Sequence, residues 1–397
     1  MHATPATYRR RRIVAVLALV TAVVGVVLAV RGAGGASEEE PATPQERRAQ
    51  ELEAEPVRLQ LSFSGDLLIH SPVYAQALAI GGGQSYDFEP MLAELRPYVN
   101  RPDLAVCHAE TPISADAPVS GYPLFNAPPE LADAVAATGW DACDTASNHT
   151  LDLGQEGVEA TIRSLGDAGL EQTGSYGSRR AQRRTLMLEA EGLKVALVSY
   201  TTDTNGIPPP ETYSVNVATA PEPVIADARR ARERGADAVI VTMHWASQIA
   251  PEYTSEPSDA VRRFARRLAR AEEITAIVGH GPHVIQPIEW IAGKPVLFSV
   301  GNLISNQTAA CCAEASQDGI VGLIDLVVDG DGDRAERVTY VPVYVNHPEY
   351  TVLPVGDALD SGQGDPASLA ASYERTVSVA GRGERIEPVP RRLGTAG

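Results

Sequence analysis

The sequence has little cysteine and too little positive charge for two common classes of protein. Of its 397 residues only four are cysteines, and none of them forms a C-x-x-C pattern, so the common cysteine-rich zinc motifs are excluded. Lysine and arginine together number 33 against 51 aspartates and glutamates, which gives a formal net charge of -18. So acidic a chain is repelled by phosphate backbones, and we expect no nucleic acid partner.

The four cysteines divide into two kinds. Cys107 and Cys143 lie in apolar, strand-like segments, where we expect them to be buried as small hydrophobic residues. Cys311 and Cys312 are adjacent in a loop-like stretch, where an oxidising compartment would permit a disulfide.

One long apolar run stands near the N-terminus. Residues 13–30 are uncharged and mostly Ala, Val and Leu, and they directly follow the four arginines at 9–12. A hydrocarbon core of about 30 Å needs about 20 helical residues, and a basic flank stays on the cytoplasmic side. We therefore predict a cytoplasmic tail at 1–12, a single transmembrane anchor at 13–30 and a globular part outside the cytoplasm. A cleavable signal peptide is the alternative, because small residues follow at 32–37.

The rest of the chain divides into a linker, one large domain and an extension. Residues 31–56 are rich in Glu, Ala, Arg and Pro without a period, which indicates a solvated linker. Alternating hydrophobic and polar residues begin where the linker ends, and we expect the domain to span 57–346. We expect a C-terminal extension at 347–397. From residue 357 onward its composition turns to Gly, Asp, Ser, Arg and Pro, which predicts a loosely ordered tail with one helix near 367–377.

Strand-like and helix-like segments alternate within the domain, and this rhythm predicts an α/β fold. The predicted strands are 57–63, 103–107, 140–145, 194–200, 238–243 and 274–278. The predicted helices between them are 90–99, 130–137, 155–168, 223–234 and 258–271. Three further strand-like segments, at 296–300, 320–328 and 337–345, suggest a second sheet.

Five of the predicted strands run into side chains of the types that bind metal ions. These side chains are Asp66, Glu110, Asn148 with His149, His244, and His280 with His283. Open α/β sheets place their sites outside the carboxyl ends of their strands. Carboxylates and imidazoles suit divalent metals, and two such ions can activate a water for displacement at phosphorus. His108 and His347, by contrast, are expected to make local polar contacts.

The segments that carry these residues resemble the CapA family, which is related to the calcineurin-like metallophosphoesterases. The segments are Gly65-Asp66, Ala109-Glu110, ASNHTLDLG at 146–154, MHW at 243–245 and GHGPHVIQP at 279–287. The resemblance covers about 57–346 and implies an αββα sandwich of two mixed sheets flanked by helices.

The resemblance also implies roles for single residues around two divalent ions, which would be Mn, Zn or Fe. The implied metal ligands are Asp66, Glu110, Asn148, His244, His280 and His283, with Glu110 as the bridge. His149 matches the position that protonates the leaving group or binds the substrate, a role that suits an imidazole. Weaker candidates for substrate binding are His70, Trp245 and Asn302.

The sequence departs from the phosphoesterase pattern at two positions, so two functions remain open. His70 lies four residues after Asp66 where the pattern has Asp-x-His, and His108-Ala109-Glu110 stands where the CapA family commonly shows Asn-Leu-Glu. The resemblance implies a metal-dependent hydrolase in capsule or poly-γ-glutamate biosynthesis, export or anchoring. The departures favour a non-catalytic assembly factor that binds the polymer. The implied partners are a cell-envelope polymer or its phosphorylated precursor, the membrane and other capsule-synthesis membrane proteins.

Overall fold

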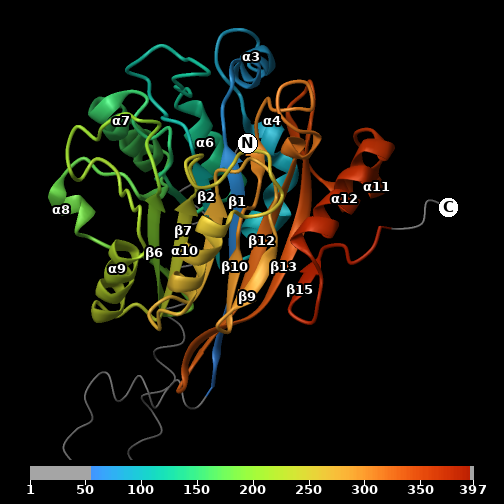
Figure 1. The fold of residues 1–397 in the computed structure, drawn as a ribbon. Coiled ribbons are helices and arrows are strands. Elements are labelled where there is room, and N and C mark those ends of the chain that lie inside the picture. The colour runs from blue at the N-terminus through green and yellow to red at the C-terminus, as the bar shows by residue number, and fades with distance from the viewer. Residues whose placement is uncertain (1–54, 394–397) are drawn as a thin grey trace, which may run out of the picture. The chain divides into compact units, whose positions relative to one another are not determined.

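The computed structural model describes residues 55–393, which fold into two mixed β-sheets with helices (Figure 1). The larger sheet contains, in spatial order, β14 (Thr351–Pro354), β13 (Gly332–Asn346), β12 (Asp318–Asp329), β1 (Val57–Leu67), β2 (Leu104–Ala109), β3 (Ala142–Asp144) and β4 (Glu171–Thr173). Two short strands join it, β11 (Asn302–Ile304) beside β1 and β15 (Ile386–Pro388) beside β13. The smaller sheet contains β5 (Leu186–Ala190), β6 (Leu193–Thr201), β7 (Ala238–His244), β8 (Ala276–His280), β10 (Lys294–Leu297) and β9 (Ile288–Ile291). The predicted α/β class with two mixed sheets is confirmed.

Parallel pairing joins the strands that carry the predicted ligands. β1 to β4 run parallel to one another, and so do β6, β7, β8 and β10. Antiparallel strands complete each sheet, with β12 beside β1 and β5 beside β6. Because parallel strands end at the same edge of a sheet, the carboxyl ends of β1 and β2 lie together in the larger sheet, and those of β7 and β8 lie together in the smaller one.

Side-chain alternation divides each sheet between an inner and an outer core. In β2, Leu104 and Val106 belong to the cluster that both sheets share, whereas Ala105 and Cys107 belong to a cluster with the helices. The strands of the smaller sheet alternate in the same way. Successive side chains of a strand point to opposite faces, so the two sheets face each other and helices cover their outer sides.

The helices that cover the larger sheet are α3 (Ser71–Ile80), α4 (Glu89–Leu92), η1 (Ala93–Leu95), α5 (Arg96–Asn100) and α6 (Glu130–Thr138). Those on the smaller sheet are α9 (Glu222–Glu233) and α10 (Asp259–Ala269), which Figure 1 shows side by side. The hydroxyl of Ser258 caps α10 by accepting from the Val261 N–H at 3.2 Å, and α10 buries Phe264 and Leu268, four residues apart. The remaining helices are α7 (Gly154–Asp167), α8 (Arg179–Gln182), η2 (Glu314–Gln317), α11 (Val355–Ser361) and α12 (Pro366–Ala380).

Every predicted strand and helix has an observed counterpart, but two wider expectations are wrong. The downstream strands β12 and β13 form no sheet of their own, because β12 pairs along β1 and extends the larger sheet. The tail after residue 357 is not loosely ordered either, since it contains α12 and β15, and β15 pairs with β13. The predicted helix near 367–377 is α12, whose Leu369 and Tyr373 are buried in the inner core. Apolar side chains four residues apart lie on one face of a helix, and this face docks α12 on the inner core.

Most of the predicted N-terminal organisation lies outside the described residues. This applies to the cytoplasmic tail at 1–12, to the apolar segment at 13–30 and to the linker up to residue 54. Between residues 55 and 393, no helix combines the length and the apolar character that a membrane span requires.

The cysteines are paired, which the sequence analysis did not expect for Cys107 and Cys143. They face each other in the register of β2 and β3 with Cα atoms 4.4 Å apart, and they form a disulfide. Cys311 and Cys312 form the second disulfide. Cys107 and Cys143 are buried as expected, but neighbouring strands align their side chains, and spacing along the sequence does not reveal that alignment.

Candidate metal centre

The carboxyl ends of four strands bring the predicted ligands together. Asp66 lies at the end of β1, Glu110 follows β2, His244 ends β7 and His280 ends β8. All four side chains are buried. The end of β1 packs closely against the residue before β11, and only glycine fits there. A Cβ at Gly65 would lie 2.3 Å from the carbonyl oxygen of Gly301.

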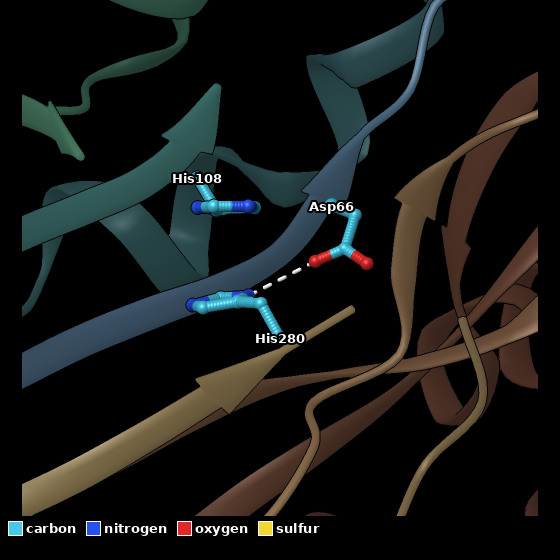
Figure 2. Close-up of side chains that lie close together, drawn as sticks. All are labelled: Asp66, His108 and His280. Carbon is cyan, nitrogen blue, oxygen red and sulfur yellow. Dashed lines mark hydrogen bonds and ion pairs between the residues drawn. The ribbon is translucent and has the colours of Figure 1, made fainter. Parts of the chain in front are cut away.

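Ligand-type atoms meet in two groups that share Asp66. One group is Asp66, Glu110 and His283, and the other is Asp66, His108 and His280. Figure 2 shows the second group, in which the rings of His108 and His280 stack with centroids 4.1 Å apart and Asp66 lies beside His280. Four of these five residues were predicted as ligands, and His108 was not.

Asp66 is the centre of the hydrogen bonding in the cluster. It accepts from His280 Nδ1 at 3.0 Å and from the Gly281 N–H at 3.4 Å, and His283 Nδ1 lies 3.3 Å from its Oδ2. Burial alone would raise the pKa of Asp66, but the bonds from His280 and His283 hold the pKa well below its usual range. Asp66 is therefore a carboxylate anion that is available as a ligand.

Several buried atoms of the candidate ligands have no hydrogen-bond partner among the described residues. These atoms are Glu110 Oε1, Glu110 Oε2, Asn148 Oδ1 and His280 Nε2. Leaving a buried polar group unsatisfied costs about 1–3 kcal/mol, and more for a charged group. Divalent cations bound at this centre would satisfy these atoms, because carboxylate, amide and imidazole donors suit such ions. The residues present therefore fit a divalent metal.

The pKa values of Glu110 and His283 show that the cluster attracts positive charge. Burial raises the pKa of Glu110 to about 7, and the nearby charge of Asp66 adds to the rise. Burial would lower the pKa of His283, but attraction to Glu110 and Asp66 raises it to about 9. A pair of buried carboxylates thus holds positive charge close by, and bound protons compete with cations for the same atoms.

His108 belongs to this centre, although the sequence analysis set it aside. Its Nδ1 lies 2.7 Å from Asp144 Oδ1 and its Nε2 lies 3.0 Å from His244 Nδ1. Burial opposes a charge on His108, but Asp144, Asp66 and Glu110 raise its pKa to about 9. The prediction of polar contacts for His108 agrees with its hydrogen bonds, but the prediction did not place His108 in a group of candidate ligands. The sequence signal for it was the histidine at a position where the family resemblance predicts asparagine.

Asn148 and His244 belong to neither of the two groups, although His244 Nδ1 lies 3.0 Å from His108 Nε2. Asn148 Nδ2 donates to Asn205 Oδ1 at 3.2 Å, which leaves Asn148 Oδ1 as the unpartnered end of the amide. Burial and the charge of His108 lower the pKa of His244 well below its usual value. His244 is therefore a neutral imidazole, the form that binds metals.

His149 lies outside both groups and has a carboxylate partner that the sequence analysis missed. Its Nδ1 lies 2.8 Å from Asp152 Oδ2, which also accepts the Phe125 N–H at 2.8 Å. The Phe125 ring meets the His149 ring edge to face, with centroids 4.7 Å apart. The Asn-His-x-x-Asp spacing was visible in the sequence and could have indicated this pair.

The three weaker candidates have different environments. His70 is partly exposed, accepts the Asn306 N–H on Nδ1 at 3.2 Å, and has its pKa lowered by burial to about 4. Trp245 is fully buried, and its Nε1–H donates to the Phe298 carbonyl at 3.0 Å. Asn302 is fully buried, and both ends of its amide bond to protein atoms. The polar atoms of Trp245 and Asn302 thus bond within the protein, and their part in substrate binding stays a prediction.

Comparison with known proteins supplies a family. The model of the family described as bacterial capsule synthesis protein PGA_cap matches residues 60–307. A probable polyglutamine synthesis accessory protein of Mycobacterium tuberculosis is 28% identical over 219 residues, which cover 51% of this chain and 56% of that protein. The PGA biosynthesis protein CapA of Bacillus subtilis is 29% identical over 177 residues, which cover 41% of this chain and 42% of that protein. The chain thus spans about half the length of the curated relatives it matches.

Solved structures show a distant likeness. A calcineurin-like phosphoesterase of Bacillus subtilis is 14% identical with a TM-score of 0.43, covering 82% of this chain and 98% of that one. A phosphatase of Mycoplasma pneumoniae is 15% identical with a TM-score of 0.42, covering 75% of this chain and 97% of that one. At such low scores these likenesses add nothing to the argument about the site, which rests on its own geometry.

Proposed function

Because this chain belongs to the family of the bacterial capsule synthesis protein PGA_cap, we propose that it is an extracytoplasmic, metal-dependent hydrolase of capsule or poly-γ-glutamate biosynthesis. Its substrate in this proposal is a phosphoester of a cell-envelope polymer or of the polymer's precursor. The observation that carries the proposal is the set of buried, unpartnered ligand atoms on Glu110, Asn148 and His280.

The proposed chemistry divides between the cations and the chain. Bound divalent ions would activate a water and neutralise the phosphoryl oxygens. Asp66, Glu110 and His283 would hold one ion. The second would take its ligands from Asn148, His244 and His280, together with Asp66, which belongs to both ligand groups.

His149 would act on the other side of the phosphoester, as the proton donor to the leaving oxygen. Asp152 accepts the bond from His149 Nδ1, so Nε2 is the nitrogen left to donate a proton. Asp152 would therefore act on the reaction only by orienting the His149 ring.

Replacing either His280 or His244 with alanine should remove about one metal equivalent per chain while the protein stays folded, because each change deletes one ligand of one proposed ion. Metal analysis of the purified proteins measures this, together with thermal unfolding. His347→Ala is the matched control, since its ring packs on Tyr350 and belongs to neither ligand group. Unchanged metal content in both variants would show that the ligand assignment is wrong.

The second candidate function is that of a non-catalytic assembly factor that binds the polymer, and one observation favours it. His70 joins neither ligand group, so the group of Asp66, Glu110 and His283 has fewer protein ligands than the phosphoesterase pattern supplies. The test is turnover of a phosphodiester by protein loaded with metal. Full metal content without turnover would favour the assembly factor, and turnover that a chelator abolishes would favour the hydrolase.

The location in the cell is part of the proposal. Residues 13–30 would anchor the chain in the membrane, where it could meet the polymer or its phosphorylated precursor and other capsule-synthesis membrane proteins. The two disulfides support a location outside the cytoplasm, because thiols stay reduced inside it. No nucleic acid partner is proposed.

The anchor predicts that detergent, but not high salt, releases the protein from membranes, because a spanning helix is held by burial and not by surface charge. Fractionation followed by blotting measures the release. A mature chain that begins near residues 33–37 by intact-mass analysis would instead establish the signal peptide.

A further inference from the structure

We propose that Asn302 is a positioning residue that fixes both the ring and the backbone of His283 for cation binding. This inference rests on the proposed metal centre. It gives a function to a side chain that is fully buried and that belongs to neither group of candidate ligands.

The hydrogen bonds of the Asn302 amide determine which of its ends faces His283. The Nδ2 group has two hydrogens and lies within 2.9–3.3 Å of four acceptors, namely the carbonyl oxygens of His283 and Ser316, Ser305 Oγ and Gln307 Oε1. With so many acceptors around Nδ2, the carbonyl end Oδ1 is the end that lies 3.1 Å from His283 Nδ1. Oδ1 can only accept, so His283 Nδ1 carries a proton.

This bond decides which nitrogen of His283 is presented to the cation. With Nδ1 protonated, Nε2 is the nitrogen that can offer a lone pair. Nε2 is also the atom that faces Glu110, at 3.8 Å from Oε1. Asp66 Oδ2 lies 3.3 Å from Nδ1 as well, but a carboxylate that binds a cation is a weaker acceptor. Asn302 is then the neutral acceptor that keeps the ring in place.

The backbone of His283 needs support of its own. Its φ is +59°, in the left-handed region that costs a non-glycine residue about 1–3 kcal/mol. Asn302 Nδ2 donates to the carbonyl of this same residue at 3.3 Å. One side chain therefore holds both the strained backbone and the ring of His283.

The position of Asn302 in the sheet explains why it can reach the centre. Asn302 on β11 is the register partner of Asp66 on β1, and the Asp66 N–H donates to the Gly301 carbonyl at 3.0 Å. Asp66 and His283 belong to one ligand group, so Asn302 is fixed relative to both. Partners that orient a metal-bound histidine typically contribute 10–100-fold to metal affinity.

The test is a titration of the full, metal-free chain with Co²⁺, followed by its absorption spectrum. Asn302→Ala should bind the cation of Asp66, Glu110 and His283 about 10–100-fold more weakly, leave the other cation unchanged and alter the Co²⁺ spectrum. Asn216→Ala is the matched control. Its buried amide donates to Tyr176 Oη and to the Ser199 carbonyl, so the change should lower thermal stability but leave Co²⁺ binding unchanged.

Gln307→Ala keeps the proposal testable if Asn302→Ala does not fold. It removes one acceptor of the Asn302 amide and should lower the affinity for the same cation by a smaller factor than Asn302→Ala does. Unchanged binding, or equal weakening of both cations, would overturn the positioning role and leave the proposed function standing. If the unsubstituted protein bound no Co²⁺, the proposed function and this inference would fail together.

Discussion

Replacing Asp66 with asparagine is expected to remove all tightly bound metal, because both groups of candidate ligands share this carboxylate. The amide has nearly the same shape but no charge, and its nitrogen end would face the Nδ1 donor of His280 or His283. The metal content should fall from about two equivalents per chain to none, along with any hydrolysis. Metal analysis after gel filtration measures this loss.

A second measurement separates lost ligation from lost folding. A cation that binds only the folded chain raises its unfolding temperature, so added Co²⁺ should stabilise the unsubstituted protein but not Asp66→Asn. The control is Asp325→Asn on β12, where the carboxylate bonds to Gln60 and Arg337 and belongs to neither ligand group. Retention of both cations by Asp66→Asn would mean that Asp66 is only a hydrogen-bond acceptor for the histidines.

The ligands at strand ends could be predicted because their signal is local. A predicted strand that runs into Asp66, into His244 or into His280 is visible without knowledge of the partner strands. The physical rule that connects them is that parallel strands end at one edge of a sheet. That rule brings His244 and His280 together on β7 and β8 of one sheet, and the packing of the two sheets against each other brings Asp66 on β1 to His280.

His108 could not be placed by the same reasoning. Its partners are Asp144, which lies 36 residues later, and His244, which lies 136 residues later. Neither distance corresponds to a helical or strand period, and a single histidine in an apolar strand is usually a local contact. Only the pairing of β2 with β3, and the approach of the second sheet, bring these groups together.

The sequence could not show which sheet β12 belongs to, for a related reason. The alternation in β12 shows that one face is buried but not which strand lies beside it, and β12 pairs with β1, some 260 residues earlier in the chain. The same holds for Asn302, whose short strand β11 gives almost no periodic signal. Its hydrogen bonds to His283 and to the loop that contains Gln307 are visible only in the fold.

Replacing His149 with alanine should leave both cations and the fold in place but lower turnover of a phosphodiester by about 10²–10⁴, the usual contribution of a positioned general acid. The reason is geometric, because His149 lies outside both ligand groups and is held by Asp152 instead. The loss should be smaller for a nitrophenyl ester, whose leaving group needs little help from a proton, than for an alkyl ester. Equal losses for the two esters would indicate substrate binding instead of proton donation.

Asp152→Asn supplies the decisive comparison, because its effect should depend entirely on His149. The amide would weaken the bond that orients the His149 ring, so turnover should fall by less than in His149→Ala with metal content unchanged. In the double variant the second change should cost nothing more, since residues that act as one unit are strongly non-additive. Additive losses would mean that Asp152 acts through its bond to the Phe125 N–H, as a support of the loop. Unchanged turnover in His149→Ala, with both cations bound, would remove the catalytic role and leave the non-catalytic assembly factor as the better account.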